Sequence, residues 1–166
     1  PNLGSHFRLT MPLEEYGSDF FGAEDLNTKD TIRLEDVKIV KKKIDLSDKN
    51  ILLVEDSKEN QILFKIFIES SRANLTIVDN GTDAIRKALS DHYDLILMDI
   101  QMPGIDGYEA LRILRGSGYD KKIIALTAHT MKGEKEKCLE AGFNGYLSKP
   151  VSQNKLLSTI KRSIQD

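Results

Sequence analysis

Short apolar runs alternate with segments of helical periodicity over the last two thirds of the chain. The five runs are Ile51–Val54, Leu75–Val78, Leu95–Met98, Ile123–Leu126 and Tyr146–Leu147. Three of them are apolar without alternation, as expected for strands covered on both faces of a sheet. Strands separated by helix-length segments predict βαβ units and a parallel sheet, so the fold class is α/β.

Residues that favour helix ends stand between these runs. The expected N-terminal caps are Ser57, Asn80 or Thr82, and Asp106. Gly142 is suited to end a fourth helix expected over about 132–141, and a fifth helix follows Pro150. The first helix carries an apolar stripe on one face, formed by Ile62, Leu63, Ile66 and Phe67. Five strands and five helices predict a doubly wound (βα)5 domain.

Composition narrows the function classes. The net charge of −2 and the pI near 6.0 give no electrostatic footprint for nucleic acid or an anionic membrane, and the basic run at 41–43 is too short to change this. A single cysteine, Cys138, excludes an internal disulfide and a cysteine-based metal cluster. The apolar runs are too short to span a bilayer, and we do not expect the first residues to be a signal peptide, because no apolar stretch follows a basic start. We expect a cytoplasmic protein, with any membrane anchor lying upstream.

Polar residues follow four of the five predicted strands. Glu55 and Asp56 come after the first strand, Asp99 after the third, Thr127 after the fourth and Lys149 after the fifth. Ligand sites of doubly wound sheets lie beyond the carboxyl ends of the strands. Each residue alone is as well explained as a cap, a turn residue or a surface charge. Together they predict three carboxylates, a hydroxyl and an ammonium at one edge of the sheet.

This set of side chains suits metal-assisted phosphoryl chemistry. Three clustered carboxylates repel one another, and a hard divalent cation such as Mg²⁺ relieves the repulsion. Asp99 is the best candidate for a carboxylate nucleophile that attacks phosphorus. The metal would screen charge on the phosphoryl oxygens, Lys149 would pair with one of them, and Thr127 could donate its hydroxyl to another.

Four motifs around these residues resemble the receiver domains of two-component signalling. They are Val54-Glu55-Asp56-Ser57, Met98-Asp99-Ile100-Gln101-Met102-Pro103-Gly104-Ile105-Asp106-Gly107, Ala125-Leu126-Thr127-Ala128 and Tyr146-Leu147-Ser148-Lys149-Pro150. The resemblance covers about residues 50–165 and is closest to receivers of hybrid histidine kinases, because Glu59-Asn60-Gln61 and Ala141–Tyr146 are typical of that group. Glu55 stands where aspartate is commoner, and Gly145 where Asp or Ala is frequent.

The resemblance implies a fold and a role for each site residue. The fold is a flavodoxin-like sandwich with strand order 2-1-3-4-5. Asp99 would take a phosphoryl group from a phosphohistidine and pass it onward, with Lys149 pairing with the phosphate and with Thr127 and Tyr146 as a switch pair. The metal, Mg²⁺ or Mn²⁺, would be bound by Asp56, Asp99 and the backbone carbonyl of Gln101, with Glu55 acting mainly through water. The Lys149–Pro150 bond would be cis.

Partners follow from the same resemblance. They would be a histidine phosphotransfer domain and a histidine kinase dimerisation domain, with no nucleic acid and no direct membrane contact. A phosphohistidine must approach Asp99 from the side of the first helix, so we expect a partner surface formed by Ile62, Lys65, Ile66 and Glu69. One or two of these should be exposed, although most of the apolar ones could simply be buried.

The first 48 residues differ in texture from the rest. Residues 1–13 resemble the last strand of a histidine kinase ATP-binding domain, because Phe7, Leu9 and Met11 alternate with polar residues, although Gly4-Ser5-His6 is also typical of an expression tag. Residues 14–48 are expected to be a linker and residues 49–166 the receiver. The parent would then be a hybrid sensor histidine kinase.

Three rival functions share some of these features. An aspartyl-phosphate hydrolase similar to haloacid dehalogenase would have an Asp-x-Asp motif after its nucleophile strand. Here Asp99 is followed by Ile100 and Gln101. A DNA-binding response regulator would need an output domain, and this sequence ends at Asp166, directly after the fifth helix. A degenerate receiver that only binds partners would lack a carboxylate or the lysine.

Overall fold

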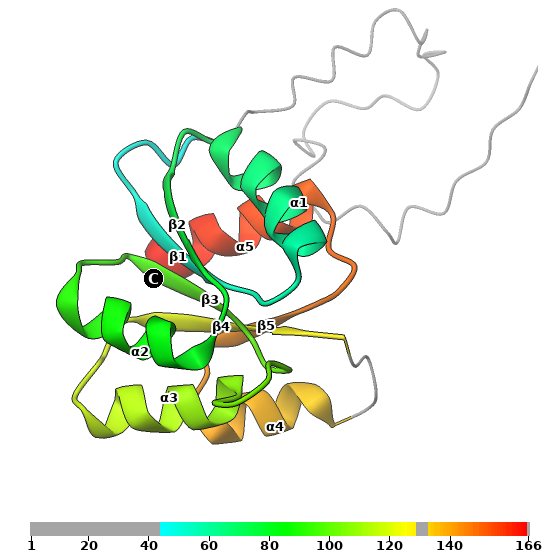
Figure 1. Cartoon of the computed structure of the whole chain (residues 1–166). Helices are drawn as coiled ribbons and strands as arrows, with labels where there is room; N and C mark the ends of the chain where they lie inside the picture. The colour runs from blue at the N-terminus through cyan, green and yellow to red at the C-terminus, as the bar shows by residue number, and fades with distance from the viewer. Residues whose placement is uncertain (1–43, 129–132, 166) are drawn as a thin grey trace, which may run out of the picture. The chain divides into compact units, whose positions relative to one another are not determined.

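Five strands and five helices alternate in residues 44–128 and 133–165, the part of the chain that the computed structural model describes (Figure 1). The strands are β1 Asn50–Val54, β2 Asn74–Val78, β3 Leu95–Asp99, β4 Lys122–Thr127 and β5 Gly145–Ser148. The helices are α1 Lys58–Glu69, α2 Gly81–Ser90, α3 Gly107–Gly116, α4 Glu134–Ala141 and α5 Gln153–Gln165. The kinase-like segment 1–13 and most of the expected linker 14–48 lie outside the described residues.

The sheet is parallel throughout and has the order β2-β1-β3-β4-β5, which confirms the predicted topology. The register places Val54 beside both Val78 and Met98, and Met98 beside Ala125. The central strands therefore end nearly level. The residues that follow them come out at one edge of the sheet.

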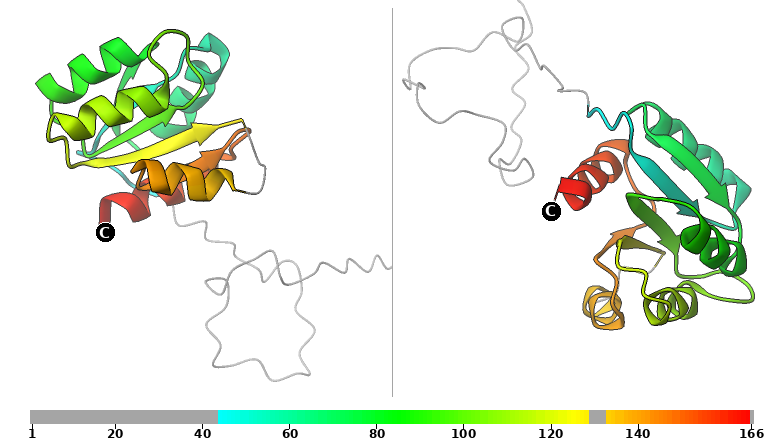
Figure 2. Two further views of the ribbon diagram at one scale, coloured as in Figure 1. Left: turned by 90° about the horizontal axis from the view of Figure 1, so that it is seen from below. Right: turned by 90° about the vertical axis from the view of Figure 1, so that its left-hand side faces the viewer.

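Helices cover both faces of the sheet: α1 and α5 lie on one side, and α2, α3 and α4 lie on the other (Figures 1 and 2). Alternate side chains of β1 pack against the helices on opposite faces of the sheet. Ile51 and Leu53 pack with α1 and α5, whereas Leu52 and Val54 pack with the opposite helices. Because both faces are covered, the central strands are wholly apolar, and truncating a buried leucine there would cost about 2–5 kcal/mol.

The helices begin and end where the sequence indicates. Ser57 Oγ accepts a hydrogen bond from the Asn60 amide at 3.3 Å, and the Asp106 carboxylate accepts one from the Glu109 amide at 2.8 Å. Asn80, rather than Thr82, caps α2. Gly142 closes α4 in the left-handed region at φ 106°, where a side chain would be strained. The longest helix has 13 residues, and no helix of the described ranges could cross a bilayer.

The apolar stripe of α1 lies mostly on the solvent side. Ile62 is 61% exposed and Ile66 is 60% exposed, and Leu63 is also exposed. The core contacts of this helix come instead from Phe64 and Ile68, which are buried against β1 and its neighbours. Helical spacing alone identified an apolar face, but it did not show which apolar residues meet the sheet.

Packing extends before β1. Leu46 is buried, and its amide donates to the Ser71 carbonyl at 2.8 Å. Ile44 packs against the same cluster, and Asp45 forms an ion pair with Arg72. Residues 44–48 therefore belong to the packed unit, so a deletion that spares the fold should stop at residue 43.

Candidate functional site

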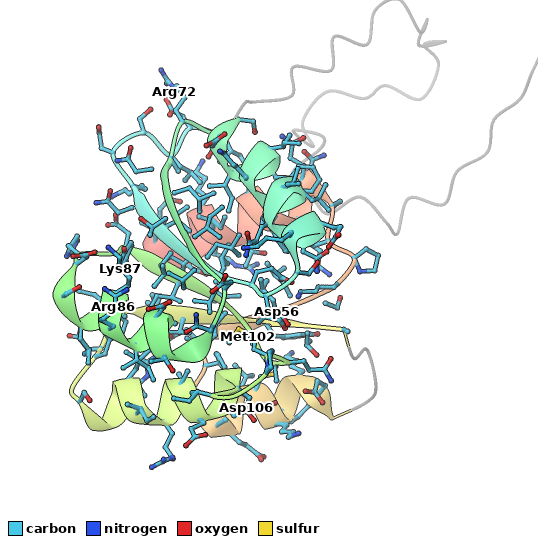
Figure 3. The ribbon with its side chains drawn as sticks, in the orientation of Figure 1. Asp56, Arg72, Arg86, Lys87, Met102 and Asp106 are labelled. Carbon is cyan, nitrogen blue, oxygen red and sulfur yellow. The ribbon has the colours of Figure 1, made fainter. Side chains whose placement is uncertain are left out.

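Three carboxylates meet at the carboxyl edge of the sheet. Glu55 and Asp56 directly follow β1, and Asp99 is the last residue of β3. One oxygen from each carboxyl group lies within 4.8 Å of the others. Glu55 and Asp99 are buried, whereas Asp56 is exposed and lies at this end of the strands in Figure 3. We call these three residues the acidic cluster.

Lys149 supplies the positive charge inside the cluster. Its Nζ lies 2.5 Å from Glu55 Oε2 and 2.6 Å from Asp99 Oδ2, so one ammonium bridges two carboxylates. The amide of Lys149 donates to the Thr127 carbonyl at 2.7 Å, which fixes the chain just after β5. The Lys149–Pro150 bond is cis, as the resemblance implies. These contacts bring together residues from the first, third and last strands.

Both carboxylate oxygens of Glu55 and its backbone carbonyl accept hydrogen bonds. Asn60 Nδ2 donates to Oε1 at 2.8 Å, and Gln61 Nε2 donates to the Glu55 carbonyl at 2.6 Å. Burial raises the pKa of Glu55, and the negative charge of Asp99 adds to this. The hydrogen bonds from Lys149 and Asn60 oppose the rise. The sequence marked Asn60 and Gln61 only as typical of a group, and it gave no sign of these contacts.

The loop after β3 is fixed by backbone contacts around Asp99. The Gln101 amide donates to Asp99 Oδ1 at 3.1 Å, and the Gly107 amide donates to the Ile100 carbonyl at 3.0 Å. A Cβ added at Gly107 would lie 2.3 Å from the Asp99 carbonyl oxygen, a distance that no side chain tolerates. The start of α3 therefore rests directly on the backbone of Asp99, and this contact needs glycine.

Thr127 and Tyr146 lie on the two neighbouring strands β4 and β5, and Tyr146 pairs in register with Ala125, two residues before Thr127. Thr127 is buried at the end of β4, next to Ser148 in the register. Tyr146 is partly exposed, and its ring lines a cavity of about 340 Å³ between β5, α4 and α5. Residues 129–132, which follow β4, lie outside the described residues.

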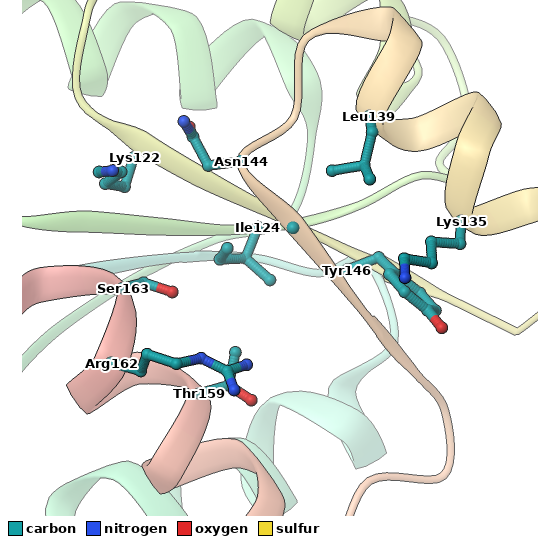
Figure 4. Close-up of a pocket in the computed structure, with 10 residues that line it drawn as sticks. Lys122, Ile124, Lys135, Leu139, Asn144, Tyr146, Thr159, Arg162 and Ser163 are labelled. Carbon is teal, nitrogen blue, oxygen red and sulfur yellow. The ribbon is translucent and has the colours of Figure 1, made fainter. Parts of the chain in front are cut away.

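We call this second site the tyrosine cavity. Lys122, Lys135 and Arg162 surround it, with Ile124 and Leu139 as apolar lining (Figure 4). No carboxylate is among its lining residues in the described part of the chain. The sequence did not predict it, because its residues come from helix faces and a strand start rather than from strand ends.

The acidic cluster fits a hard divalent cation. Mg²⁺ prefers oxygen ligands and is commonly held by one or two carboxylates together with water. Here two buried carboxylates and one exposed carboxylate converge, and the exposed side leaves access to solvent. The predicted residues Glu55, Asp56, Asp99, Lys149 and Thr127 all lie at this edge of the sheet.

Comparison with known proteins decides the family. The sequence model of the response regulator receiver domain matches residues 51–161. The chain belongs to the receiver domain family. This assignment agrees with the strand order and with the residues at the sheet edge, and it argues against the hydrolase alternative. As a receiver domain, the chain takes part in phosphorelay signal transduction.

The receiver is similar both to segments of large kinases and to small proteins. It is 36% identical over 115 residues to the sensor histidine kinase GacS of Pseudomonas protegens, covering 66% of this chain but only 12% of GacS. It is 38% identical over 120 residues to the response regulator DivK of Brucella ovis, covering 71% of this chain and 98% of DivK. The match to GacS therefore concerns one small part of that kinase.

Solved structures give the same fold. The receiver domain of the sensor histidine kinase PA1611 from Pseudomonas aeruginosa, with a magnesium ion coordinated in its active-site cleft, is 41% identical (TM-score 0.66; 71% of this chain, 98% of that chain). The receiver domain of Ssk1 from Saccharomyces cerevisiae, solved with the histidine phosphotransfer protein Ypd1, is 31% identical (TM-score 0.63; 69% of this chain, 88% of that chain).

Proposed function

We propose that this receiver accepts a phosphoryl group on Asp99 from a phosphohistidine and passes it onward. The observation that carries the proposal is the position of Asp99: its carboxylate lies 2.6 Å from the Lys149 ammonium, within a cluster of two further carboxylates. A buried nucleophile beside a cation and a metal-binding set of oxygens suits attack on phosphorus.

In the proposed step, a carboxylate oxygen of Asp99 attacks the phosphorus atom of the phosphohistidine. The P–N bond breaks, and its electron pair stays on the imidazole nitrogen, which takes up a proton. Lys149 then pairs with a phosphoryl oxygen in place of its present carboxylate contact. Thr127, buried at the end of β4, donates its hydroxyl to another oxygen.

The metal ligands in this proposal are Asp56, Asp99 and the backbone carbonyl of Gln101, with Glu55 acting through water. When bound, Mg²⁺ neutralises charge that builds on the phosphoryl oxygens. The magnesium-bound PA1611 receiver supports this choice of metal. We propose that Mn²⁺, which also favours oxygen ligands, can substitute.

We further propose that Thr127 and Tyr146 form a switch pair. Movement of Thr127 toward the phosphoryl group would vacate space, and the partly exposed Tyr146 ring would turn into that space. Amide shifts recorded with and without beryllofluoride test this. Changes confined to the neighbours of Asp99, with none at Tyr146, would contradict the switch.

The proposed parent is a hybrid sensor histidine kinase, with residues 1–13 as the end of its ATP-binding domain. The packing of residues 44–48 moves the expected start of the receiver from residue 49 to residue 44, so we propose 14–43 as the linker and 44–166 as the receiver. The likeness to GacS supports this parent. The proposed partners are the kinase dimerisation domain and a histidine phosphotransfer domain, and the Ssk1–Ypd1 complex supports the latter. The partner surface would be Ile62, Lys65, Ile66 and Glu69 on α1, and the cytoplasmic location stays a prediction.

Labelling by acetyl phosphate tests the proposed chemistry. Intact mass should show one added phosphate in Mg²⁺ or Mn²⁺ and none in EDTA. Asp99→Asn should abolish labelling. Asp106→Asn is the matched control, because asparagine caps a helix as well as aspartate does, and it should label normally. Labelling of Asp99→Asn at the unmodified rate would show that another residue is the nucleophile.

A further inference from the structure

Glu55 is one methylene longer than an aspartate, and its carboxylate is fastened at both oxygens. Oε2 accepts from Lys149 at 2.5 Å, and Oε1 accepts from the side-chain amide of Asn60 at 2.8 Å. The residue is fully buried, so these two donors satisfy its carboxylate oxygens in this arrangement. The two donors together fix which oxygen faces the rest of the acidic cluster.

Asn60 is itself well anchored. It lies in the first turn of α1, where its backbone amide donates to the cap Ser57 at 3.3 Å. Within the described residues its side-chain amide has no acceptor other than Glu55. Asn60 is not within hydrogen-bond distance of Asp56, Asp99 or Lys149 in that part of the chain, so its influence on the cluster passes through Glu55.

We infer that Asn60 is a positioning residue that tunes metal affinity by orienting the Glu55 carboxylate. The inference rests on the proposed metal site and adds a residue to it. A glutamate has more rotatable bonds than an aspartate, so a free glutamate loses more conformational freedom when a hydrated metal binds. The amide of Asn60 holds Oε1 and leaves Oε2 directed at Lys149 and Asp99.

The arrangement depends on the length of the side chain at position 55. Shortening it to aspartate withdraws the carboxylate from α1 and lengthens or breaks the contact with Asn60. The side-chain amide of Asn60 and the additional methylene of Glu55 are therefore both needed for this contact. Loss of an outer-shell partner of this kind commonly reduces metal affinity about 10- to 100-fold.

Binding of Mg²⁺ without a phosphodonor tests this role. The dissociation constant would be measured from amide shifts of the whole chain as Mg²⁺ is added. Asn60→Ala should raise it at least about tenfold. Gln61→Ala is the matched control: it removes the neighbouring amide, which donates to the Glu55 backbone carbonyl and not to its carboxylate. It should lower the unfolding midpoint in urea but change Mg²⁺ affinity less than about twofold.

The change at Asn60 should also depend on Glu55. In a Glu55→Asp background, Asn60→Ala should alter Mg²⁺ affinity less than about twofold, which a general loss of stability would not produce. Asn60→Leu, which keeps the volume of the side chain, serves if the alanine variant does not fold. An unchanged affinity in both Asn60 variants, equal losses in Gln61→Ala, or the same loss in the Glu55→Asp background would each overturn the inference. Because no phosphodonor is present, failure of Asp99 as the phosphoacceptor would be seen separately.

Discussion

β5 links the acidic cluster to the tyrosine cavity, but the two sites are built in opposite ways. In the cluster, three carboxylates surround one ammonium, and three of the four side chains are largely buried. In the cavity, Lys122, Lys135 and Arg162 have no ion pair within the described residues. β5 connects the two, because Tyr146 lines the cavity and Lys149 reaches the cluster three positions later.

The difference shows what fixes the positions of the side chains in each site. Residues of the cluster sit on or next to strand ends, so the hydrogen-bond ladder of the sheet fixes their backbones. Cations of the cavity lie mostly on two helices and end in flexible side chains, which lose entropy when they are held. We therefore expect substitutions in the cluster to have large chemical effects and substitutions in the cavity to have small ones.

Removing one cation from each region should give the largest contrast. Lys149→Ala should slow labelling by acetyl phosphate about 10²- to 10³-fold, as expected when a group that stabilises developing phosphoryl charge is lost. Arg162→Ala should leave the rate within about twofold, since solvated charges far from a site are screened. The measurement is the initial rate of phosphate addition by intact mass at saturating Mg²⁺. Similar losses in the two variants would refute the assignment of Lys149.

The two ends of α3 allow a test of how tightly the cluster is fixed. Gly107→Ala should destabilise the fold by about 1–3 kcal/mol, because its Cβ would collide with the backbone of Asp99 and Ile100. Gly116→Ala, at the other end of the helix, has open space around it and should stabilise by about 0.4–1 kcal/mol. Urea unfolding measures both. A Gly107→Ala variant of normal stability would mean that the loop can move away without cost.

Substitutions of exposed apolar residues near the acidic cluster and near the tyrosine cavity should differ in their effect on phosphotransfer from a phosphohistidine protein. Ile66→Glu on α1 should slow phosphotransfer from a phosphohistidine protein about tenfold, as for a moderate interface contact, but spare labelling by acetyl phosphate. Leu139→Glu, an exposed leucine at the tyrosine cavity, is the control and should affect neither reaction. Equal loss with both donors in Ile66→Glu would indicate damage to the fold instead of the partner surface.

The sequence predicted most of the fold because its signals are local. Ser57, Asp106 and Gly142 end helices through contacts within a few residues, and strand runs such as Leu95–Met98 are apolar because both faces are covered. The acidic cluster was predictable for a related reason: in a parallel sheet, residues after different strands meet at one edge.

Other features depend on packing between distant segments and were not predictable. Ile62 and Ile66 are exposed, as expected for one or two positions of the partner surface, but the helical stripe did not show that Phe64 would be the residue that faces the sheet. The contact of Asn60 with Glu55 depends on a rotamer. The need for glycine at position 107 depends on how closely α3 approaches β3.

The bridge from Lys149 to Glu55 and Asp99 spans 94 and 50 residues of sequence. During synthesis the N-terminal strands leave the ribosome first, so the carboxylates emerge well before the lysine that balances them. Until the last strand docks, the nascent domain holds an acidic cluster without its ammonium. The site is therefore complete only after Lys149 has left the ribosome and β5 has joined the sheet.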